Sequence, residues 1–304
     1  MYYNLEAFGR EFRHIRNKLG LTQKNLAEKA LIHEDTLRKI ENGKVLPTQQ
    51  TLDLLSPLLK IDLNGLLLNY RFNNAANFKI ISNEIEYLLD CDNHQALAKK
   101  LDYLKQLVST EENSYFIGKV TQMIFLLESI LLYKEKNCTT GAFNKLLEAM
   151  KITTPKFSLQ KYQVFPLNST ELRILMNIAL VINNSADDND SLNIMKHCLN
   201  VTEINDTLYP KICHNLSYLY HLRDKHEFAL KYSCLGIDGC VQQRNFNGLN
   251  LLFYRKGIAS YLLKNDDFLS FLKKSINLCE MMNQVDLSNL LMLNCKKYYN
   301  IDLK

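Results

Sequence analysis

The chain is poor in the residues that make tight turns, because its 304 residues include only 10 Gly and 5 Pro. Hairpins and β-sandwiches need many such residues to reverse the chain between strands. Hydrophobic residues make up 47% of the sequence, which is enough to bury a sizeable core. The sequence therefore predicts an all-α protein. Its length is typical of two domains, or of one small domain followed by a repeat array.

Charge and cysteine content narrow the class further. The net charge is only +5, so any affinity for nucleic acid has to come from a local arrangement of basic residues. The eight cysteines form no C-x-x-C pair, and the start of the chain lacks the apolar core of a signal peptide. We expect a reduced, cytoplasmic protein without disulfides. We expect no apolar run to reach the roughly 18 residues that are needed to span a bilayer, and we expect no membrane partner.

The first helical pattern lies at the start of the chain. Apolar residues recur there at three- and four-residue steps, which is one face of a helix. They are Leu5, Phe8, Phe12, Ile15 and Leu19. Gly20 ends this helix as a C-terminal cap, and Thr22 is a good N-cap for a second helix that runs to Ala30.

Two further helices follow. After a short joint at residues 31–33, a third helix is expected over about residues 34–42, with Leu37 and Ile40 inward. A fourth begins at the cap candidate Thr48. A helix, a short turn and a second helix that crosses it form a helix-turn-helix.

About the first 65 residues resemble the lambda-repressor-like fold of the XRE and Cro regulators. The residues that carry the resemblance are Arg16, Gly20-Leu21-Thr22-Gln23, Leu26-Ala27, Ile40-Glu41-Asn42-Gly43 and Pro47. Leu31 departs from the pattern, because the family commonly has Gly in that turn. We expect a different or strained turn at this position.

The resemblance implies that the third helix enters the major groove of DNA with its first residues facing base edges. Base reading is expected from Glu34, Asp35 and Lys39, because carboxylates accept from cytosine N4 and Lys donates to guanine. In the alternative interpretation, Glu34 and Asp35 only favour the dipole at the helix N-terminus. The other polar candidates on this helix are His33, Thr36 and Arg38.

Phosphate contacts would set register and affinity without reading sequence. The candidates are Gln23, Asn42, Lys44 and Arg13. Gln23 is placed among them because family members touch a phosphate at that helix N-terminus. Relatives carry an internal ion pair that corresponds to Arg16 and Glu41, and these two residues are not expected to touch DNA.

The rest of the chain predicts a linker over residues 69–79 and a repeat domain over residues 80–304. Helical segments separated by polar breaks suggest an α-solenoid, and the clearest unit resembles a tetratricopeptide repeat. Small residues at Ala179, Ser217 and Gly257 mark successive units 38 and 40 residues apart. Earlier degenerate units are expected over 80–107 and 115–150, and a terminal capping helix from Val285 onward.

In such solenoids the first helix of each pair lines the concave face. Asn177 and Asn215 lie two residues before the small anchors, and their carboxamides suit an extended peptide backbone. One turn earlier lie Arg173 and Lys211, which could attract a carboxylate. Tyr218 and Tyr254 could form the floor of an apolar pocket. These six residues are the predicted peptide-binding site, although Asn is also a frequent consensus residue at that repeat position.

The combined order of domains resembles the peptide-pheromone receptors of Gram-positive bacteria, the PlcR, PrgX and NprR group together with the Rgg regulators. "NSTELRILMNIAL", "YRKGIASY" and "LKKSINLCEMMNQ" look like stretches of those proteins. The resemblance implies a cytoplasmic quorum-sensing transcription regulator, usually a homodimer. It would bind double-stranded DNA at a palindromic operator, use no cofactor, and be switched by a short signalling oligopeptide in the concave groove.

Two other functions stay open. In one, the repeats of a DNA-binding protein hold a protein partner instead of a free peptide. In the other, the protein is an enzyme. The sequence has none of the nucleotide-binding, zinc-protease or serine-hydrolase motifs. His221 and His226 lie five residues apart, off a shared helical face, so we expect neither a metal pair nor enzymatic activity.

Overall fold

The computed structural model describes residues 3–71, 75–91, 93–109, 111, 114–183 and 189–303. In these ranges every regular element is a helix, so the all-α prediction is confirmed. The chain divides into two compact units. One holds residues 1–84 and 106–117, and the other holds residues 85–105 and 118–304. Part of the predicted linker, 72–74, and part of the polar break before Asp190, 184–188, lie outside the described residues.

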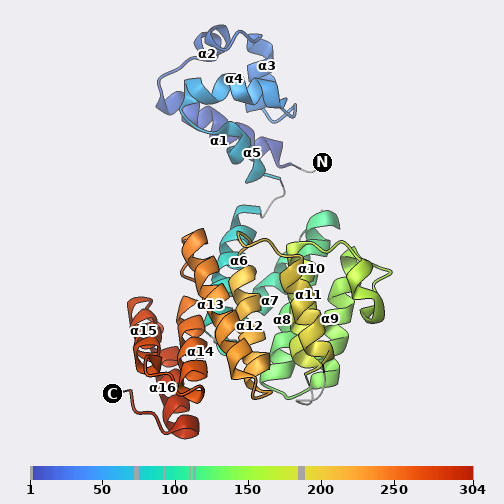
Figure 1. The fold of residues 1–304 in the computed structure, drawn as a ribbon. Coiled ribbons are helices and arrows are strands. Elements are labelled where there is room, and N and C mark those ends of the chain that lie inside the picture. Colours follow the sequence, from blue (N-terminus) through green and yellow to red (C-terminus); the bar gives the residue numbers. More distant parts are fainter. Residues whose placement is uncertain are drawn as a thin grey trace. The chain divides into compact units, whose positions relative to one another are not determined.

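The first unit begins with five short helices (Figure 1). They are α1 (Leu5–Lys18), α2 (Gln23–Lys29), α3 (Glu34–Glu41), α4 (Gln49–Leu59) and α5 (Leu63–Leu68). The predicted caps Thr22 and Thr48 each accept a backbone N–H three residues on, from Asn25 and Thr51. Helix α5 was not expected from the sequence.

Helix α1 crosses the end of α3 at very close range. The apolar stripe predicted for α1 is buried at Leu5, Phe8 and Phe12, whereas Leu19 is exposed. Gly9 makes the approach possible, because a Cβ on it would lie 2.5 Å from the carbonyl oxygen of Glu41. A side chain there would push the two helices apart.

Leu31 occupies the turn between α2 and α3 with a φ of 54°. This is the left-handed region, where the Cβ of an L-residue crowds the following carbonyl and costs roughly 1–2 kcal/mol. The side chain is 90% exposed, so no burial compensates for the strain. The expectation of a strained turn at this departure from the family pattern is confirmed.

The remaining helices follow one another along the chain (Figure 1). They are α6 (Ala75–Asp90), α7 (His94–Ser109), α8 (Ser114–Lys134), α9 (Thr139–Thr153), the 3₁₀ helix η1 (Leu159–Val164), α10 (Ser169–Val181), α11 (Asp190–Asn200), α12 (Tyr209–His221), α13 (His226–Gln243), α14 (Leu249–Leu262), α15 (Phe268–Met281) and α16 (Val285–Tyr299). The predicted capping helix corresponds to α16. Helix η1 was not expected.

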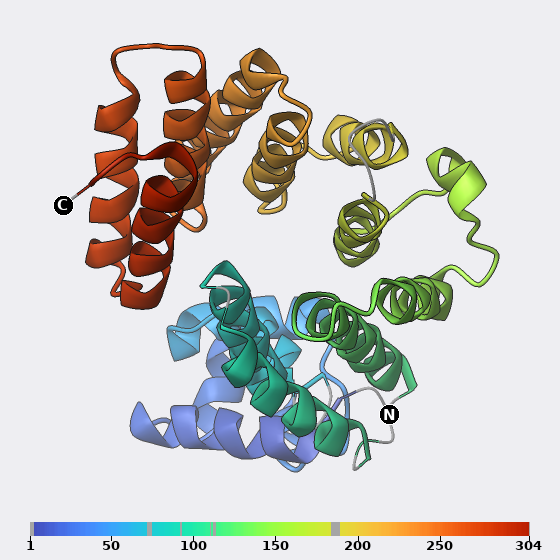
Figure 2. The same ribbon diagram turned by 90° about the horizontal axis from the view of Figure 1, so that it is seen from below.

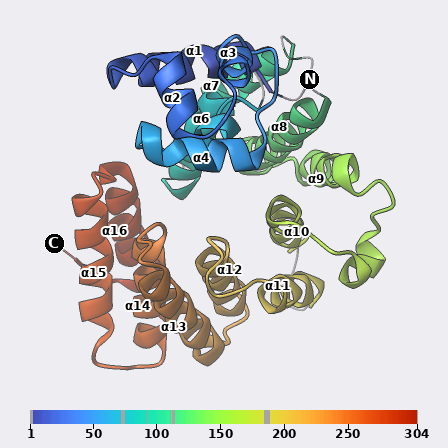
Figure 3. The ribbon, with the colours of Figure 1, turned by 90° about the horizontal axis from the view of Figure 1, so that it is seen from above.

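Within the second unit, α10/α11, α12/α13 and α14/α15 are helix pairs whose axes lie side by side. Seen end-on, helices α9 to α16 follow a curved row (Figures 2 and 3). This is the arrangement of an α-solenoid, so the predicted solenoid fold is confirmed.

Small residues let the paired helices approach closely, as the repeat pattern predicts. The hydroxyl of Ser217 in α12 donates to the carbonyl oxygen of Ala229 in α13 at 2.8 Å. A Cβ on Gly236 would lie 2.5 Å from Cδ2 of Leu252, and one on Gly257 would lie 2.6 Å from Cδ2 of Leu272. Larger residues at these glycines would therefore separate successive helices.

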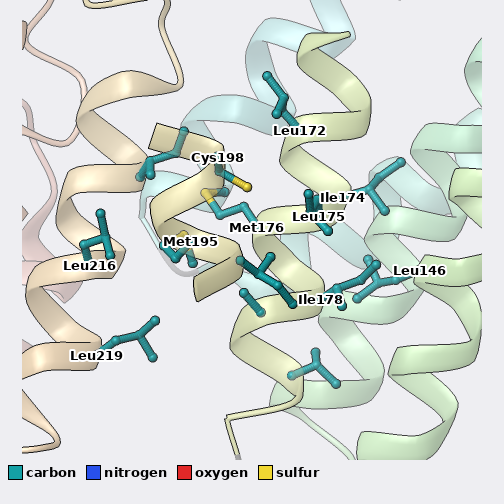
Figure 4. Packing of buried hydrophobic residues seen from close by; sticks show 14 of the residues in the cluster. Leu146, Leu172, Ile174, Leu175, Met176, Ile178, Met195, Cys198, Leu216 and Leu219 are labelled. Atoms are coloured by element: carbon teal, nitrogen blue, oxygen red, sulfur yellow. The ribbon is translucent and has the colours of Figure 1, made fainter. Parts of the chain in front are cut away.

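The largest apolar core of the second unit fills the space between α9, α10, α11 and α12. Figure 4 shows Leu146, Ile178 and Met195 meeting there from three different helices. Cys198 lies in this core, and burial raises the pKa of its thiol to about 12. All eight cysteines are free thiols in this structure.

Helix α8 corrects one expectation from the sequence. By length and composition it is apolar enough to cross a membrane, although no such run was expected. However, Gln122 in the middle of this helix donates to the carbonyl oxygen of Ala149 at 3.0 Å and to Thr153 Oγ1 at 2.9 Å. Glu128 binds both Lys105 and Lys145. We therefore interpret α8 as a core helix.

The strain at Leu31 leads to a stability prediction. Replacing Leu31 by Gly should stabilise the α2–α3 turn by about 0.5–1 kcal/mol, because the left-handed strain exceeds the entropic cost of Gly. Native-state hydrogen exchange of the α2 and α3 amides in the full chain would measure the change. Leu31→Ala keeps the strained backbone and should show no gain. Equal protection in both variants would contradict the assignment of strain to this residue.

Candidate functional site

Helix α3 has one buried and one exposed face. Leu37 and Ile40 are buried in the core, whereas Glu34, Arg38 and Lys39 are exposed. The exposed residues and the half-buried Asp35 and Thr36 form the predicted reading surface. His33 stands before the helix as its N-cap, and its Nδ1 accepts from the backbone N–H of Asp35 at 3.1 Å.

The acidic and basic candidates on α3 are paired with one another. Asp35 accepts from Arg38 at 2.5 Å and from Lys39 at 2.7 Å. The hydrogen bond from Lys39, and next that from Arg38, lower the pKa of Asp35. A base contact by Asp35 or Lys39 would therefore have to break at least one of these two ion pairs.

Glu41 is the buried centre of the first unit. It accepts from Arg16 Nε at 2.5 Å, from Gln23 Nε2 at 2.7 Å and from Arg13 Nε at 3.1 Å. Burial by itself would raise the pKa of Glu41, but the bonds from Arg16 and Gln23 outweigh it, so the pKa is lowered. The ion pair expected between Arg16 and Glu41 is present.

Several of the predicted phosphate-binding side chains take part in this internal network. The Gln23 amide donates to Glu41, and Asn42 Oδ1 accepts from Arg13 at 2.7 Å. A side-chain contact from Gln23 or Asn42 to a phosphate would require these bonds to rearrange. Lys44 is exposed.

The second unit contains a cavity of about 840 Å³. It is formed mainly by side chains of α10, α12, α14 and α16. The structure brings all six residues of the predicted peptide-binding site to it. They are Arg173, Asn177, Lys211, Asn215, Tyr218 and Tyr254.

Two of these residues bind a carboxylate of the protein itself. Glu86 of α6 accepts from both terminal nitrogens of Arg173, one at 2.7 Å, and from Lys211 Nζ at 2.8 Å. Burial by itself would raise the pKa of Glu86, but Arg173 and Lys211 lower it to about 2. Glu86 already supplies a carboxylate to this cationic pair, and a ligand carboxylate would have to compete with it.

The two asparagines have local partners. Asn177 Nδ2 donates to the carbonyl oxygen of Arg173, one turn earlier in the same helix, at 2.8 Å. Asn215 Oδ1 lies 3.3 Å from His214 Nδ1. Both carboxamides line the cavity, where a peptide backbone could meet them.

The two tyrosines share a partner, Arg255, that the predicted site did not include. The Arg255 guanidinium carbon lies 4.5 Å from the ring centroid of Tyr218 and 5.8 Å from that of Tyr254. Arg255 falls in the repeat position that Asn177 and Asn215 occupy in the preceding units. Repeat alignment could therefore have found it. Glu86 lies in the degenerate unit expected over 80–107, where no anchor residue was identified, and so it gave no signal.

Two histidines that line the cavity, His214 and His221, are neutral at pH 7. Burial, with the charge of Arg255 next, lowers the pKa of His214 to about 3 and that of His221 to about 4. His221 ends α12 and His226 begins α13, so they lie on consecutive helices with ring centroids 5.6 Å apart. In the part of the chain that the structure describes, no group of three His, Cys, Asp or Glu side chains could hold a metal ion.

Residues 12–66 match the family described as Helix-turn-helix. They form a helix-turn-helix domain. No curated protein sequence matches the chain significantly. The match covers α2, α3 and the Glu41 network, so the predicted domain type is confirmed on the residues that carried the resemblance.

Solved structures match nearly the whole chain. It is similar to Bacillus thuringiensis PlcR in complex with the peptide PapR7 and DNA, with a TM-score of 0.74 and 16% identity, over 94% of this chain and 99% of that one. ComR from S. thermophilus in complex with DNA and its signalling peptide ComS matches with a TM-score of 0.59 and 15% identity, over 93% and 97%. A point mutant of PrgX matches with a TM-score of 0.58 and 17% identity, over 95% of this chain and 93% of that one.

At these identities the matches establish a shared fold. The helix-turn-helix domain followed by a helical solenoid is the architecture of these regulators, as the resemblance implied.

The Glu86 cluster leads to a prediction on acid stability. Replacing Glu86 by Gln should destabilise the second unit by about 2–3 kcal/mol at pH 7, because Arg173 and Lys211 lose their shared anion. A carboxylate with a folded pKa of about 2 stabilises fully above its ordinary value of 4.5 and loses this effect as the pH falls toward 2. The gap between wild type and variant should therefore narrow below pH 4.5.

Urea denaturation followed by circular dichroism at several pH values would measure this gap. Glu203→Gln removes an exposed carboxylate and should change stability little. A Glu86→Gln variant as stable as wild type at pH 7 would show that the cluster contributes nothing to folding.

Proposed function

We propose that the protein is a cytoplasmic quorum-sensing transcription regulator. It binds double-stranded DNA through its helix-turn-helix domain and is switched by a short signalling peptide in the cavity of the second unit. The observation that carries the proposal is the convergence of six residues, chosen from repeat positions alone, on one cavity of peptide-accepting size. The matched PlcR and ComR structures contain both DNA and a peptide, which supports this function.

The proposal divides the chain into a DNA-binding domain over residues 1–68, a linker over 69–79 and a peptide-binding and dimerising repeat domain over 80–304. In a homodimer, two copies of α3 would read the two halves of a palindromic operator. The half-sites have to lie about 34 Å apart, or a multiple of that distance, for both helices to reach the major groove.

Coupling between the two sites follows from linkage. A peptide that binds one arrangement of the repeats better than another shifts the population toward it. If the arrangements separate the DNA-binding domains differently, operator affinity changes by the same coupling free energy. Calorimetric binding of a peptide without any change in operator affinity would contradict this coupling.

The alternative is a DNA-binding protein whose repeats hold a protein partner. A broad protein interface would not depend on two carboxamides inside a cavity, whereas a short peptide would. No catalytic activity is part of the proposal, because the matched proteins are regulators and the sequence carries none of the motifs sought for enzymes.

Lys39 of the reading surface and Lys44, a predicted phosphate contact, should behave differently on DNA. Lys39→Ala should cost about 1–3 kcal/mol on the preferred operator and relax specificity at one base position. Lys44→Ala should weaken binding to all sequences and reduce the slope of affinity against salt by about one unit. Selection from random duplexes, followed by fluorescence anisotropy at several salt concentrations, separates the two effects. Unchanged selectivity in Lys39→Ala would exclude a base contact.

Substitution of Asn177 and Asn215 should distinguish a peptide ligand from a protein partner. A heptapeptide selected on the wild-type protein from a random library should bind at least about ten-fold more weakly to the Asn177→Ala/Asn215→Ala variant, because the lost backbone hydrogen bonds act together. Isothermal titration calorimetry would measure the affinity. Asn193→Ala/Asn277→Ala removes two exposed carboxamides outside the cavity and should leave it unchanged. Equal affinity in both double variants would favour the protein-partner alternative.

A further inference from the structure

The cavity of the second unit is electropositive. Four basic side chains are among its lining residues: Lys134, Arg173, Lys211 and Arg255. No Asp or Glu is found among the described residues that line it. Since His214 and His221 are neutral at pH 7, they add no charge of either sign. A ligand that enters this cavity therefore meets positive charge from several helices.

Arg173 and Lys211 differ from Arg255 in one respect. Both of them bind Glu86, so a carboxylate already balances their charge. Arg255 has no carboxylate partner in the described parts of the chain. Its Nε donates to His214 Nε2 at a long 3.4 Å, and its guanidinium carbon lies over the rings of Tyr218 and Tyr254.

The surroundings of Arg255 favour the binding of an anion. Burial lowers the pKa of Arg255, although a guanidinium stays charged at pH 7. Burial also raises the pKa of the phenols of Tyr254 and Tyr299, so these neighbours remain neutral. No hydrogen bond links the terminal nitrogens of Arg255 to any described residue. A partly desolvated charge without a counter-ion is costly, and a carboxylate on the guanidinium fork would remove that cost.

Other partly buried arginines of the chain show the contrast. Arg16 has the Glu41 carboxylate, and Arg223 donates to the Leu219 carbonyl oxygen at 2.9 Å and to Asn183 Oδ1 at 2.9 Å. Arg255 alone among the three has only a weak imidazole bond and aromatic faces. It also stands at the repeat position where the two preceding units present carboxamides to the cavity.

We infer that Arg255 is the subsite for a carboxylate of the bound peptide. The inference rests on the proposed function and specifies its ligand class. The ligand is an oligopeptide in the cavity, and either an acidic side chain or its free C-terminal carboxylate binds the Arg255 guanidinium. Tyr218 and Tyr254 hold the guanidinium plane in place. Asn177 and Asn215 contact the peptide backbone beside it.

Three heptapeptide libraries test this on the full chain. The first is blocked at both ends and carries one Asp at a varied position. The second has a free C-terminal carboxylate and no Asp or Glu. The third is blocked at both ends and has no acid. Affinity selection with mass spectrometry should show that wild type retains peptides of the first or second library at least about ten-fold more than those of the third.

Variants locate the effect at one side chain. Arg255→Gln should reduce retention of the acidic peptides about 10- to 100-fold, to the level of the third library. Arg255→Lys keeps the positive charge but loses the paired guanidinium donors, so it should retain part of the preference for acidic peptides. Lys256→Gln removes a neighbouring charge that stacks on Phe271 and does not line the cavity, and it should behave as wild type.

Each outcome decides something different. Preference for the first library over the second identifies an acidic side chain, and the reverse identifies the C-terminus. Equal retention of the third library by wild type would overturn the Arg255 subsite and leave the peptide-receptor function standing. Retention of no peptide from any library would overturn both. The comparison of libraries on wild type holds even if Arg255→Gln fails to fold.

Discussion

The close approach of paired helices at small residues is the constraint on which the second unit depends. Ser217 reaches the backbone of α13, and Gly236 and Gly257 leave room for leucines of the next helix and no more. Because each pair meets only its neighbours, these contacts set how successive pairs stack. The first helices of successive pairs then present the same positions to one side. The cavity exists because this stacking is regular enough to bring α10, α12 and α14 around a common space.

One carboxylate, buried in the first unit and half-buried in the second, joins several helices in each unit. Glu41 joins α1, α2 and α3 through Arg13, Arg16 and Gln23. Glu86 joins α6, α10 and α12 through Arg173 and Lys211. In each case a carboxylate offsets its loss of hydration by accepting several charged hydrogen bonds. In each case the carboxylate also accepts hydrogen bonds from side chains that the sequence analysis predicted to bind a ligand.

How well each feature was predicted depends on how far apart in the sequence the interacting residues lie. Caps such as Thr22 and Thr48 depend on residues three positions away, so local pattern was enough to place them. The strained turn at Leu31 was foreseen, because one missing Gly in a known motif is a local fact. Helices α5 and η1 were missed because they are short, with weak periodicity. The length of the apolar run in α8 was underestimated from the sequence, and the contacts of Gln122 to α9 are what indicate a core helix.

Local sequence was sufficient to determine the all-α class, the helix-turn-helix, the repeat anchors and the six residues that meet at one cavity. These depend on periodicity and spacing along single helices. Only the tertiary structure decided which basic groups of the cavity are already paired. Glu86 lies 87 positions from Arg173 and 125 from Lys211, a separation that no local pattern encodes. The same long-range packing places the Glu86 carboxylate on Arg173 and Lys211. It leaves Arg255 in the cavity lining with no carboxylate partner among the described residues.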